Sequence, residues 1–194
     1  MNHSTIENAV STLFSIFEKH GTDAYFGEPV TQLKHACQAA EYARTEGYDD
    51  EVIIAAFLHD IGHLCIEAND DNKMENLGIL DHEIVGAKYL ADLGFSKKIC
   101  QLIASHVAAK RYLTFKNPVY YQNLSEASKQ TLTYQGGVMS ASEAAAFESD
   151  PLSILYVQMR LWDEKAKIAD APLPDLGFYK DLIQKHLVTS ISFR

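Results

Sequence analysis

The sequence has no hydrophobic run long enough to cross a membrane, although 47% of its 194 residues are hydrophobic. A transmembrane helix needs about 20 consecutive, predominantly apolar residues. The opening segment, MNHSTIENAV, also lacks the basic flank and the apolar run of a secretion signal. We therefore expect a cytoplasmic protein with enough apolar side chains to fill a core.

Cysteine and positive charge are both scarce. The three cysteines, Cys37, Cys65 and Cys100, lack the close spacing of a metal-binding motif, so we expect ordinary reduced thiols. The chain carries 17 Lys and Arg against 26 Asp and Glu, a net charge of −9. A nucleic-acid partner would need a basic face, so the composition argues against that class. A small anionic substrate is compatible with it, because metal ions can supply positive charge locally.

The alternation of polar and apolar residues that marks a half-buried β-strand is absent from the sequence. Nearly every segment instead has apolar residues at helical spacing, and capping residues mark the helix starts. We expect helices over residues 4–21, 29–47, 50–65, 81–94, 97–113, 125–133, 140–149, 151–170 and 175–187. With no repeat and no linker, the sequence predicts an all-α fold in one compact domain, residues 1–194.

The stretch AAFLHDIGHLC, residues 55–65, interrupts an apolar segment with His59, Asp60 and His63. Burying ionisable groups is costly unless cations or hydrogen bonds compensate. Three more histidines and one more aspartate interrupt other predicted helices in the same way: His35, His82, His106 and Asp163. Imidazole and carboxylate ligands together suit iron, manganese or zinc, so the sequence predicts a buried metal site.

Six of these side chains form a candidate ligand set: His35, His59, Asp60, His82, His106 and Asp163. An aspartate can bridge two metals with its two oxygens, in which case His82 and His106 would hold the second metal. A lone histidine is more often a hydrogen-bonded core or surface residue, but a set spread over several apolar helices favours a metal site. Asp163 is the weakest member, because LWDEKAK could equally form a solvated helix face on which Glu164 is the competing acid.

The order H…HD…H…H…D resembles the HD-domain superfamily, and the extra histidines are typical of its dinuclear members. Most members are metal-dependent phosphohydrolases, but one branch, related to myo-inositol oxygenase, contains mixed-valence diiron oxygenases. Within that branch the sequence is similar to the phosphonate-cleaving oxygenases of PhnZ type. The similarity covers nearly the whole chain and is densest in YFGE, QLKH, LHDIGH, SHVAAKRYL, NLSEAS, YQGG and WDEK.

The resemblance implies that the six candidate ligands hold two irons, Fe(II) and Fe(III), with O₂ as co-substrate. The first iron would have four protein ligands: His35, His59, Asp60 and Asp163. Asp60 would bridge to the second iron, which His82 and His106 would complete. Three protein ligands leave open positions on the second iron, which is typical of a catalytic metal rather than a structural one.

The resemblance also implies contacts with the substrate. Lys110 and His63, each one helical turn after a candidate ligand, would offset the charge of a phosphonate and act in catalysis beside Asp60. From pattern alone, Lys110 could equally be a surface lysine and His63 a core histidine. Ser128, in NLSEAS, would contact the phosphonate.

Tyr25 and Glu28 precede the first ligand helix in the segment DAYFGEPV. In the resembled enzymes such a tyrosine occupies the open iron position until substrate displaces it, and the glutamate hydrogen-bonds the tyrosine. The glutamate would then meet the substrate's amine. Gly27 between them provides backbone freedom for this exchange. The alternative is a loop tyrosine that packs on the core and a glutamate favoured at a helix start.

Together these residues imply O₂-dependent cleavage of the carbon–phosphorus bond of a (R)-1-hydroxy-2-aminoethylphosphonate. The products would be phosphate and glycine, or glycine betaine from the N-trimethyl form, and the sequence leaves the methylation state open. The partner would be this small molecule alone, with no nucleic acid and no membrane, supplied by a phosphonate hydroxylase in organophosphonate catabolism.

Two other functions compete with this one. A dinuclear metal-dependent HD phosphohydrolase, a nucleotidase or phosphatase, would use the same ligands with a metal-bound hydroxide and would not need Tyr25. A degenerate HD module that only binds a signal or a partner would have lost some ligands, whereas this chain keeps all six.

Overall fold

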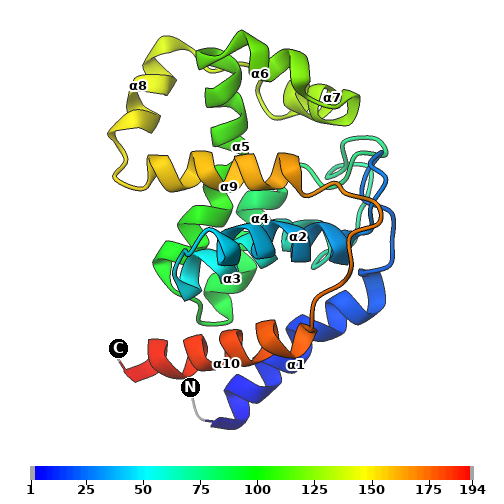
Figure 1. The fold of residues 1–194 in the computed structure, drawn as a ribbon, viewed down its shortest axis with the longest axis vertical. Helices are drawn as coiled ribbons and strands as arrows, with labels where there is room; N and C mark the ends of the chain where they lie inside the picture. The colour runs from blue at the N-terminus through cyan, green and yellow to red at the C-terminus, as the bar shows by residue number, and fades with distance from the viewer. Residues whose placement is uncertain (1–2, 193–194) are drawn as a thin grey trace.

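This computed structural model describes residues 3–192, and they form a helical fold (Figure 1). The prediction of an all-α fold is confirmed, because the only strand-like pairings in that range are two isolated bridges, Ala24–Thr31 and Lys73–Ile79. The elements in chain order are α1 (His3–His20), α2 (Gln32–Thr45), α3 (Asp50–Leu58), the 3₁₀ helix η1 (Ile61–His63), α4 (His82–Asp92), α5 (Lys97–Lys116), α6 (Pro118–Asn123), α7 (Glu126–Tyr134), α8 (Ala141–Ser149), α9 (Ser153–Lys165) and α10 (Leu176–Ser192).

The helix α5 lies at the centre of the molecule. α3, α4 and α9 pack against it, and α2 packs on α3 and α9. α1 and α10 lie side by side at one end, and α6, α7 and α8 lie at the other (Figure 1). An apolar core joins these layers and includes Leu13, Ala40, Ile54, Leu102 and Trp162. This arrangement places α2, α3, α4, α5 and α9 around one common interior.

The helix α3 is buried on every side, since each residue from Val52 to Leu58 is buried. Its start is capped by Asp49, whose side chain accepts a hydrogen bond from the Val52 amide at 3.1 Å. A surface helix would show a polar face, so α3 is a core helix. It is nevertheless short, and no helix within residues 3–192 has the length and apolarity needed to span a membrane.

The predicted helix over residues 50–65 ends early, at Leu58. The chain then turns through Asp60 into η1. Gly62, in η1, lies so close to the start of α4 that any side chain there would clash with the His82 carbonyl. The chain thus leaves the helical path after Leu58, and η1 packs closely on α4. As a result, His59 and Asp60 follow the helix end and face the interior together.

Other predicted boundaries are also wrong, and two of them bear on the site. α2 begins at Gln32 rather than Pro29, because the Thr31 hydroxyl accepts a hydrogen bond from the Lys34 amide at 3.3 Å and caps the helix there. α9 ends at Lys165 instead of continuing to residue 170. α6 was not predicted, and none of its residues is buried, so it has no apolar stripe that a sequence pattern could reveal.

Candidate metal centre and its pocket

The structure brings the six predicted ligands together in the interior. None of them exposes more than 8% of its surface. They come from four helices and the turn after α3: His35 from α2, His59 and Asp60 from the turn, His82 from the start of α4, His106 from α5 and Asp163 from α9. Residues distant in the sequence therefore converge on one point, as the metal prediction required.

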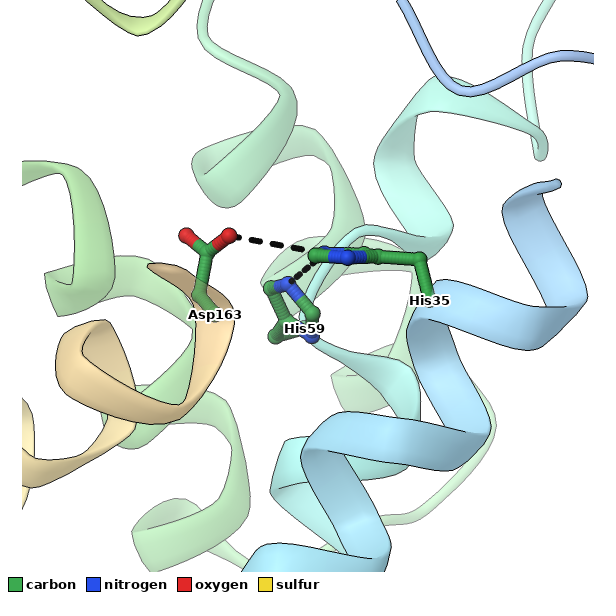
Figure 2. A group of neighbouring side chains, drawn as sticks. All are labelled: His35, His59 and Asp163. Atoms are coloured by element: carbon green, nitrogen blue, oxygen red, sulfur yellow. Dashed lines mark hydrogen bonds and ion pairs between the residues drawn. The ribbon is translucent and has the colours of Figure 1, made fainter. Parts of the chain in front are cut away.

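His35, His59 and Asp163 form one group of candidate ligands (Figure 2). The Nε2 atom of His35 lies 3.1 Å from Nε2 of His59 and 3.4 Å from Oδ1 of Asp163. Figure 2 shows the two imidazoles and the carboxylate pointing toward one another from separate elements. Such a set of nitrogen and oxygen donors could hold a metal ion of the iron, manganese or zinc type.

Asp60 lies between this group and a second one. Its Oδ2 is 3.5 Å from Nε2 of His35 and 3.3 Å from Nε2 of His59. Its Oδ1 is 3.3 Å from Nε2 of His82 and 3.6 Å from Nε2 of His106, and those two nitrogens are 3.0 Å apart. Each carboxylate oxygen therefore faces a different pair of imidazoles, which is the arrangement a bridge between two metals requires.

The hydrogen bonds of the imidazoles indicate which nitrogens are free for a metal. Three rings use Nδ1 to reach backbone carbonyls at 2.8–2.9 Å: His35 to Ala166, His59 to Ala56 and His106 to Ile103. A carbonyl oxygen only accepts, so these Nδ1 atoms carry the protons. In the neutral rings, Nε2 of His35 and Nε2 of His59 then present lone pairs to each other. Two facing lone pairs repel unless a proton or a metal ion lies between them, so the donor set calls for a cation at this point and fits a metal.

The electrostatics of the two groups differ. Burial acts to lower the pKa of His35, but hydrogen bonds and attraction from Asp163 and Asp60 outweigh it and raise this pKa to about 9. Burial and the nearby His82 lower the pKa of His106 to about 3. Burial would raise the pKa of Asp60, yet the surrounding histidines hold it well below its usual value. The carboxylates therefore stay ionised and attract positive charge.

His82 differs from the other three ligand histidines. Within the described residues its Nδ1 has no hydrogen-bond partner, and neither has Oε2 of Glu83. These two buried atoms are 3.6 Å apart. A carboxylate beside the outer nitrogen of a metal-binding imidazole commonly orients the ring and raises its basicity.

All five predicted substrate contacts line one small pocket beside Asp60: Tyr25, Glu28, His63, Lys110 and Ser128. The cavity has a volume of about 50 Å³. The residues that the sequence placed around a phosphonate are therefore adjacent to the candidate metal ligands.

Tyr25 closes this pocket at the metal side. Its hydroxyl donates a hydrogen bond to Oδ2 of Asp60 at 2.8 Å, and its ring stacks on His35 with centroids 3.9 Å apart. The Glu28 amide donates a hydrogen bond to the Tyr25 carbonyl at 2.7 Å, but the Glu28 carboxylate does not pair with the Tyr25 hydroxyl as predicted. The Glu28 carboxylate instead accepts a hydrogen bond from the ammonium group of Lys167 at 2.8 Å. The Tyr25 hydroxyl is already bonded to Asp60, whereas Lys167 offers electrostatic attraction as well as a hydrogen bond.

His63 presents a proton donor to the pocket. Its Nδ1 accepts a hydrogen bond from the Ile79 amide at 2.9 Å, so in the neutral ring Nε2 carries the proton. Burial and the neighbouring His82, on which the ring stacks with centroids 3.8 Å apart, hold the pKa of His63 well below its usual value. A neutral N–H in this position can donate to an oxygen of a bound anion.

Two cations of this pocket, Arg160 and Lys167, were not predicted from the sequence. Arg160 donates to Oδ2 of Asp163 at 2.5 Å and also pairs with Glu164. The signal was present in the sequence, because these cations lie three positions before and four after Asp163 and so would share its side of the predicted helix over residues 151–170. Glu164, considered as an alternative to Asp163, pairs with these cations and stays outside the ligand group.

Lys110 is the third cation of the pocket. It is buried, and its ammonium group donates to Oγ1 of Thr131 at 2.9 Å. Burial and the nearby Arg160 lower the pKa of Lys110 well below its usual value. The hydroxyl of Ser128 lies 3.3 Å from Nζ of Lys167 and 3.5 Å from Nη2 of Arg160. Three basic side chains and one hydroxyl thus surround a space that suits an anion, and an anion bound there would favour the charged form of Lys110.

Comparisons with known proteins give the family. The HD-domain profile matches residues 32–135. The chain is 40% identical to the hydroxymethylphosphonate dioxygenase of Gimesia maris, over 92% of this chain and 88% of that one. It is 39% identical to the glycine-betaine-forming [1-hydroxy-2-(trimethylamino)ethyl]phosphonate dioxygenase of Leisingera caerulea, over 92% and 90%. An uncharacterized protein of Acanthamoeba polyphaga mimivirus is 43% identical over 97% of this chain and 86% of its own length.

These similarities confirm the resemblance inferred from the sequence motifs and support an oxygenase over a phosphohydrolase. The profile ends before Asp163, whereas the two named relatives are similar over most of the chain. The buried histidine and aspartate groups fit a metal-dependent enzyme. The chain therefore belongs to the HD-domain family and, within it, to the phosphonate dioxygenases.

Proposed function

We propose that this protein is a mixed-valence diiron dioxygenase that cleaves the carbon–phosphorus bond of a 1-hydroxyalkylphosphonate. The observation that carries the proposal is the position of Asp60, whose two oxygens face separate pairs of imidazoles. In the proposal His35, His59, Asp60 and Asp163 hold the first iron, and Asp60, His82 and His106 hold the second. When bound, the irons would supply Lewis acidity toward the substrate's oxygens and the means to activate O₂.

The protein's own part is to bind the substrate and to orient it. Lys110, Arg160 and Lys167 line the pocket and would neutralise the phosphonate dianion. The Nε2–H group of His63 would donate a hydrogen bond to a phosphonate oxygen. Tyr25 would leave its place on Asp60 when substrate enters, because the cavity with Tyr25 in place has only about 50 Å³.

The overall reaction balances without a further reactant. O₂ provides one oxygen atom to the carboxylate that forms at carbon 1 and one to the phosphorus, which leaves as phosphate. Carbon 1 is oxidised, O₂ is reduced, and the carbon–phosphorus bond breaks. From (R)-1-hydroxy-2-aminoethylphosphonate the products are phosphate and glycine, and from its N-trimethyl form phosphate and glycine betaine. A hydroxylase acting on the parent phosphonate must supply the 1-hydroxyl group.

The test is phosphate release by the iron-loaded protein with and without O₂. Three substrates cover the chemistry: hydroxymethylphosphonate, (R)-1-hydroxy-2-aminoethylphosphonate and its N-trimethyl form. We expect release only in O₂. Release from phosphate esters with Mn²⁺ under nitrogen, together with inertness toward all three phosphonates, would instead establish the phosphohydrolase alternative.

A further inference from the structure

The ion pair between Glu28 and Lys167 forms part of the lining of the pocket. Nζ of Lys167 lies 2.8 Å from Oε1 of Glu28, and the two side chains expose only 14% and 10% of their surface. The pair joins residues that are 139 positions apart, one before α2 and one after α9. It therefore ties the Tyr25–Glu28 segment to the end of the helix that carries Asp163.

Lys167 has further acceptors in reach. Its ammonium group lies 3.4 Å from Oε2 of Glu164 and 3.3 Å from the hydroxyl of Ser128. The Glu28 carboxylate, in contrast, accepts its hydrogen bond from Lys167. Lys167 can thus give up Glu28 and keep a carboxylate partner, whereas Glu28 needs another cation to replace Lys167, because an unpaired buried charge is strongly destabilising.

We propose that Lys167 determines specificity in this part of the pocket: its ammonium group occupies the position on Glu28 that a substrate ammonium takes, and it shifts to Glu164 when an aminated substrate binds. This inference rests on the proposed function. A substrate without nitrogen leaves the ion pair in place. A primary amine exchanges one hydrogen-bonded cation on Glu28 for another, whereas a trimethylammonium group cannot donate the hydrogen bond that Lys167 gives up.

The consequence is that Lys167 weakens the binding of an aminated substrate relative to one without nitrogen. Without the lysine, Glu28 would be unpaired in a buried pocket, and the substrate's ammonium would be its only close cation. Removing the lysine should therefore strengthen the binding of (R)-1-hydroxy-2-aminoethylphosphonate relative to that of hydroxymethylphosphonate.

The experiment measures dissociation constants by calorimetry on the iron-loaded protein under nitrogen, so that no turnover occurs. The ligands are (R)-1-hydroxy-2-aminoethylphosphonate and hydroxymethylphosphonate. For Lys167→Met we expect the ratio of the two constants to shift toward the aminated ligand by about tenfold or more, the size of one charged hydrogen bond. Lys165→Met is the matched control, because Lys165 is exposed and lies over the ring of Tyr42. It should leave the ratio unchanged.

A second variant approaches the same pair from the other side. Glu28→Gln should weaken the binding of the aminated ligand relative to hydroxymethylphosphonate. In a protein that already carries Glu28→Gln, adding Lys167→Met should no longer change the ratio of the two dissociation constants. An unchanged ratio in a folded Lys167→Met protein would overturn the inference, and so would an unchanged ratio in Glu28→Gln if the lysine variant does not fold. Failure of the unmodified protein to bind either phosphonate would refute the proposed function, and this inference with it.

Discussion

Asp60 is the residue on which both halves of the candidate metal centre depend. Its oxygens lie 3.3 Å from Nε2 of His59 on one side and 3.3 Å from Nε2 of His82 on the other. The remaining ligands each reach one side only. A change at Asp60 should therefore affect both metals, while a change at Asp163 should affect mainly the first.

We expect Asp60→Ala to lose both irons, because neither group keeps its shared carboxylate. The measurement is iron content per chain after loading and desalting. Asp163→Ala is the comparison and should retain part of the metal. A folded Asp60→Ala protein with the same iron content as the unmodified chain would contradict the bridging role.

Lys110 provides a second prediction at this scale. It is buried beside the pocket, whereas the adjacent Arg111 forms an ion pair with Glu143 near the surface. We expect Lys110→Met to raise the KM for the phosphonate about tenfold or more, since a hydrogen bond to a charged group contributes roughly 1.5–3 kcal/mol. Arg111→Met is the matched control and should leave KM nearly unchanged. An equal effect of the two variants would remove Lys110 from the substrate site.

At the scale of elements, the contact between η1 and α4 determines how His59 and Asp60, in the turn between α3 and η1, face the interior. Gly62 lies against the backbone of His82 and Gly86, where a Cβ would clash. We expect Gly62→Ala to push α4 away and to lower both the melting temperature and the iron content. Gly47, whose added Cβ would meet nothing within 4 Å, is the control for a glycine change without a clash. Its positive φ of 80° costs stability but should leave the iron content unchanged.

The hydrogen bond that joins α10 to α2 carries a pH-dependent contribution. Arg44 and the hydroxyl of Tyr179 both donate to Glu41, and together they lower the pKa of this carboxyl although burial opposes them. A depressed folded pKa adds stability above the unfolded value of about 4.3, and this contribution is lost as pH falls through the folded pKa. Glu41→Gln should therefore destabilise the protein near neutral pH, with the difference shrinking below about pH 4.

The measurement for Glu41 is the free energy of unfolding in urea at several pH values. Glu18→Gln, a change at an exposed carboxylate on α1, is the control and should show a smaller effect. A difference for Glu41→Gln that stays constant with pH would mean that its carboxylate is not stabilised by these two partners.

The elements also show how far the sequence could lead. The ligand residues were predictable because each interrupts an apolar helix, and the structure brings all six together. The end of α3 at Leu58 was not predictable, because it accompanies the contact of Gly62 with α4, and local propensity does not contain that contact. The pairing of Glu28 with Lys167 was missed for the same reason, since the two residues are 139 positions apart. The metal and substrate roles of these residues stay predictions.

At the scale of the whole molecule, metal binding and folding should be coupled. The candidate ligands come from α2, α4, α5, α9 and the turn after α3, which together surround the interior. A ligand that binds only the folded state stabilises it by mass action. We expect removal of iron by a chelator to lower the melting temperature, and reloading to restore it. Asp60→Ala should show no such response. Equal melting temperatures with and without iron in the unmodified protein would contradict the coupling.

The early end of α3 has a further consequence, in the dipoles of the helices. α3 ends next to His59, and α9 ends at Lys165, just after Asp163, so two helix C-termini are directed to the first ligand group. α4 begins at His82, so a helix N-terminus is directed to the second. C-termini carry partial negative charge and N-termini partial positive charge, each worth typically 0.3–1 kcal/mol. The backbone therefore adds partial negative charge beside the first ligand group, which favours a cation there. It adds partial positive charge beside the second, where it would favour the oxygens of the anionic substrate that the proposal places on that iron.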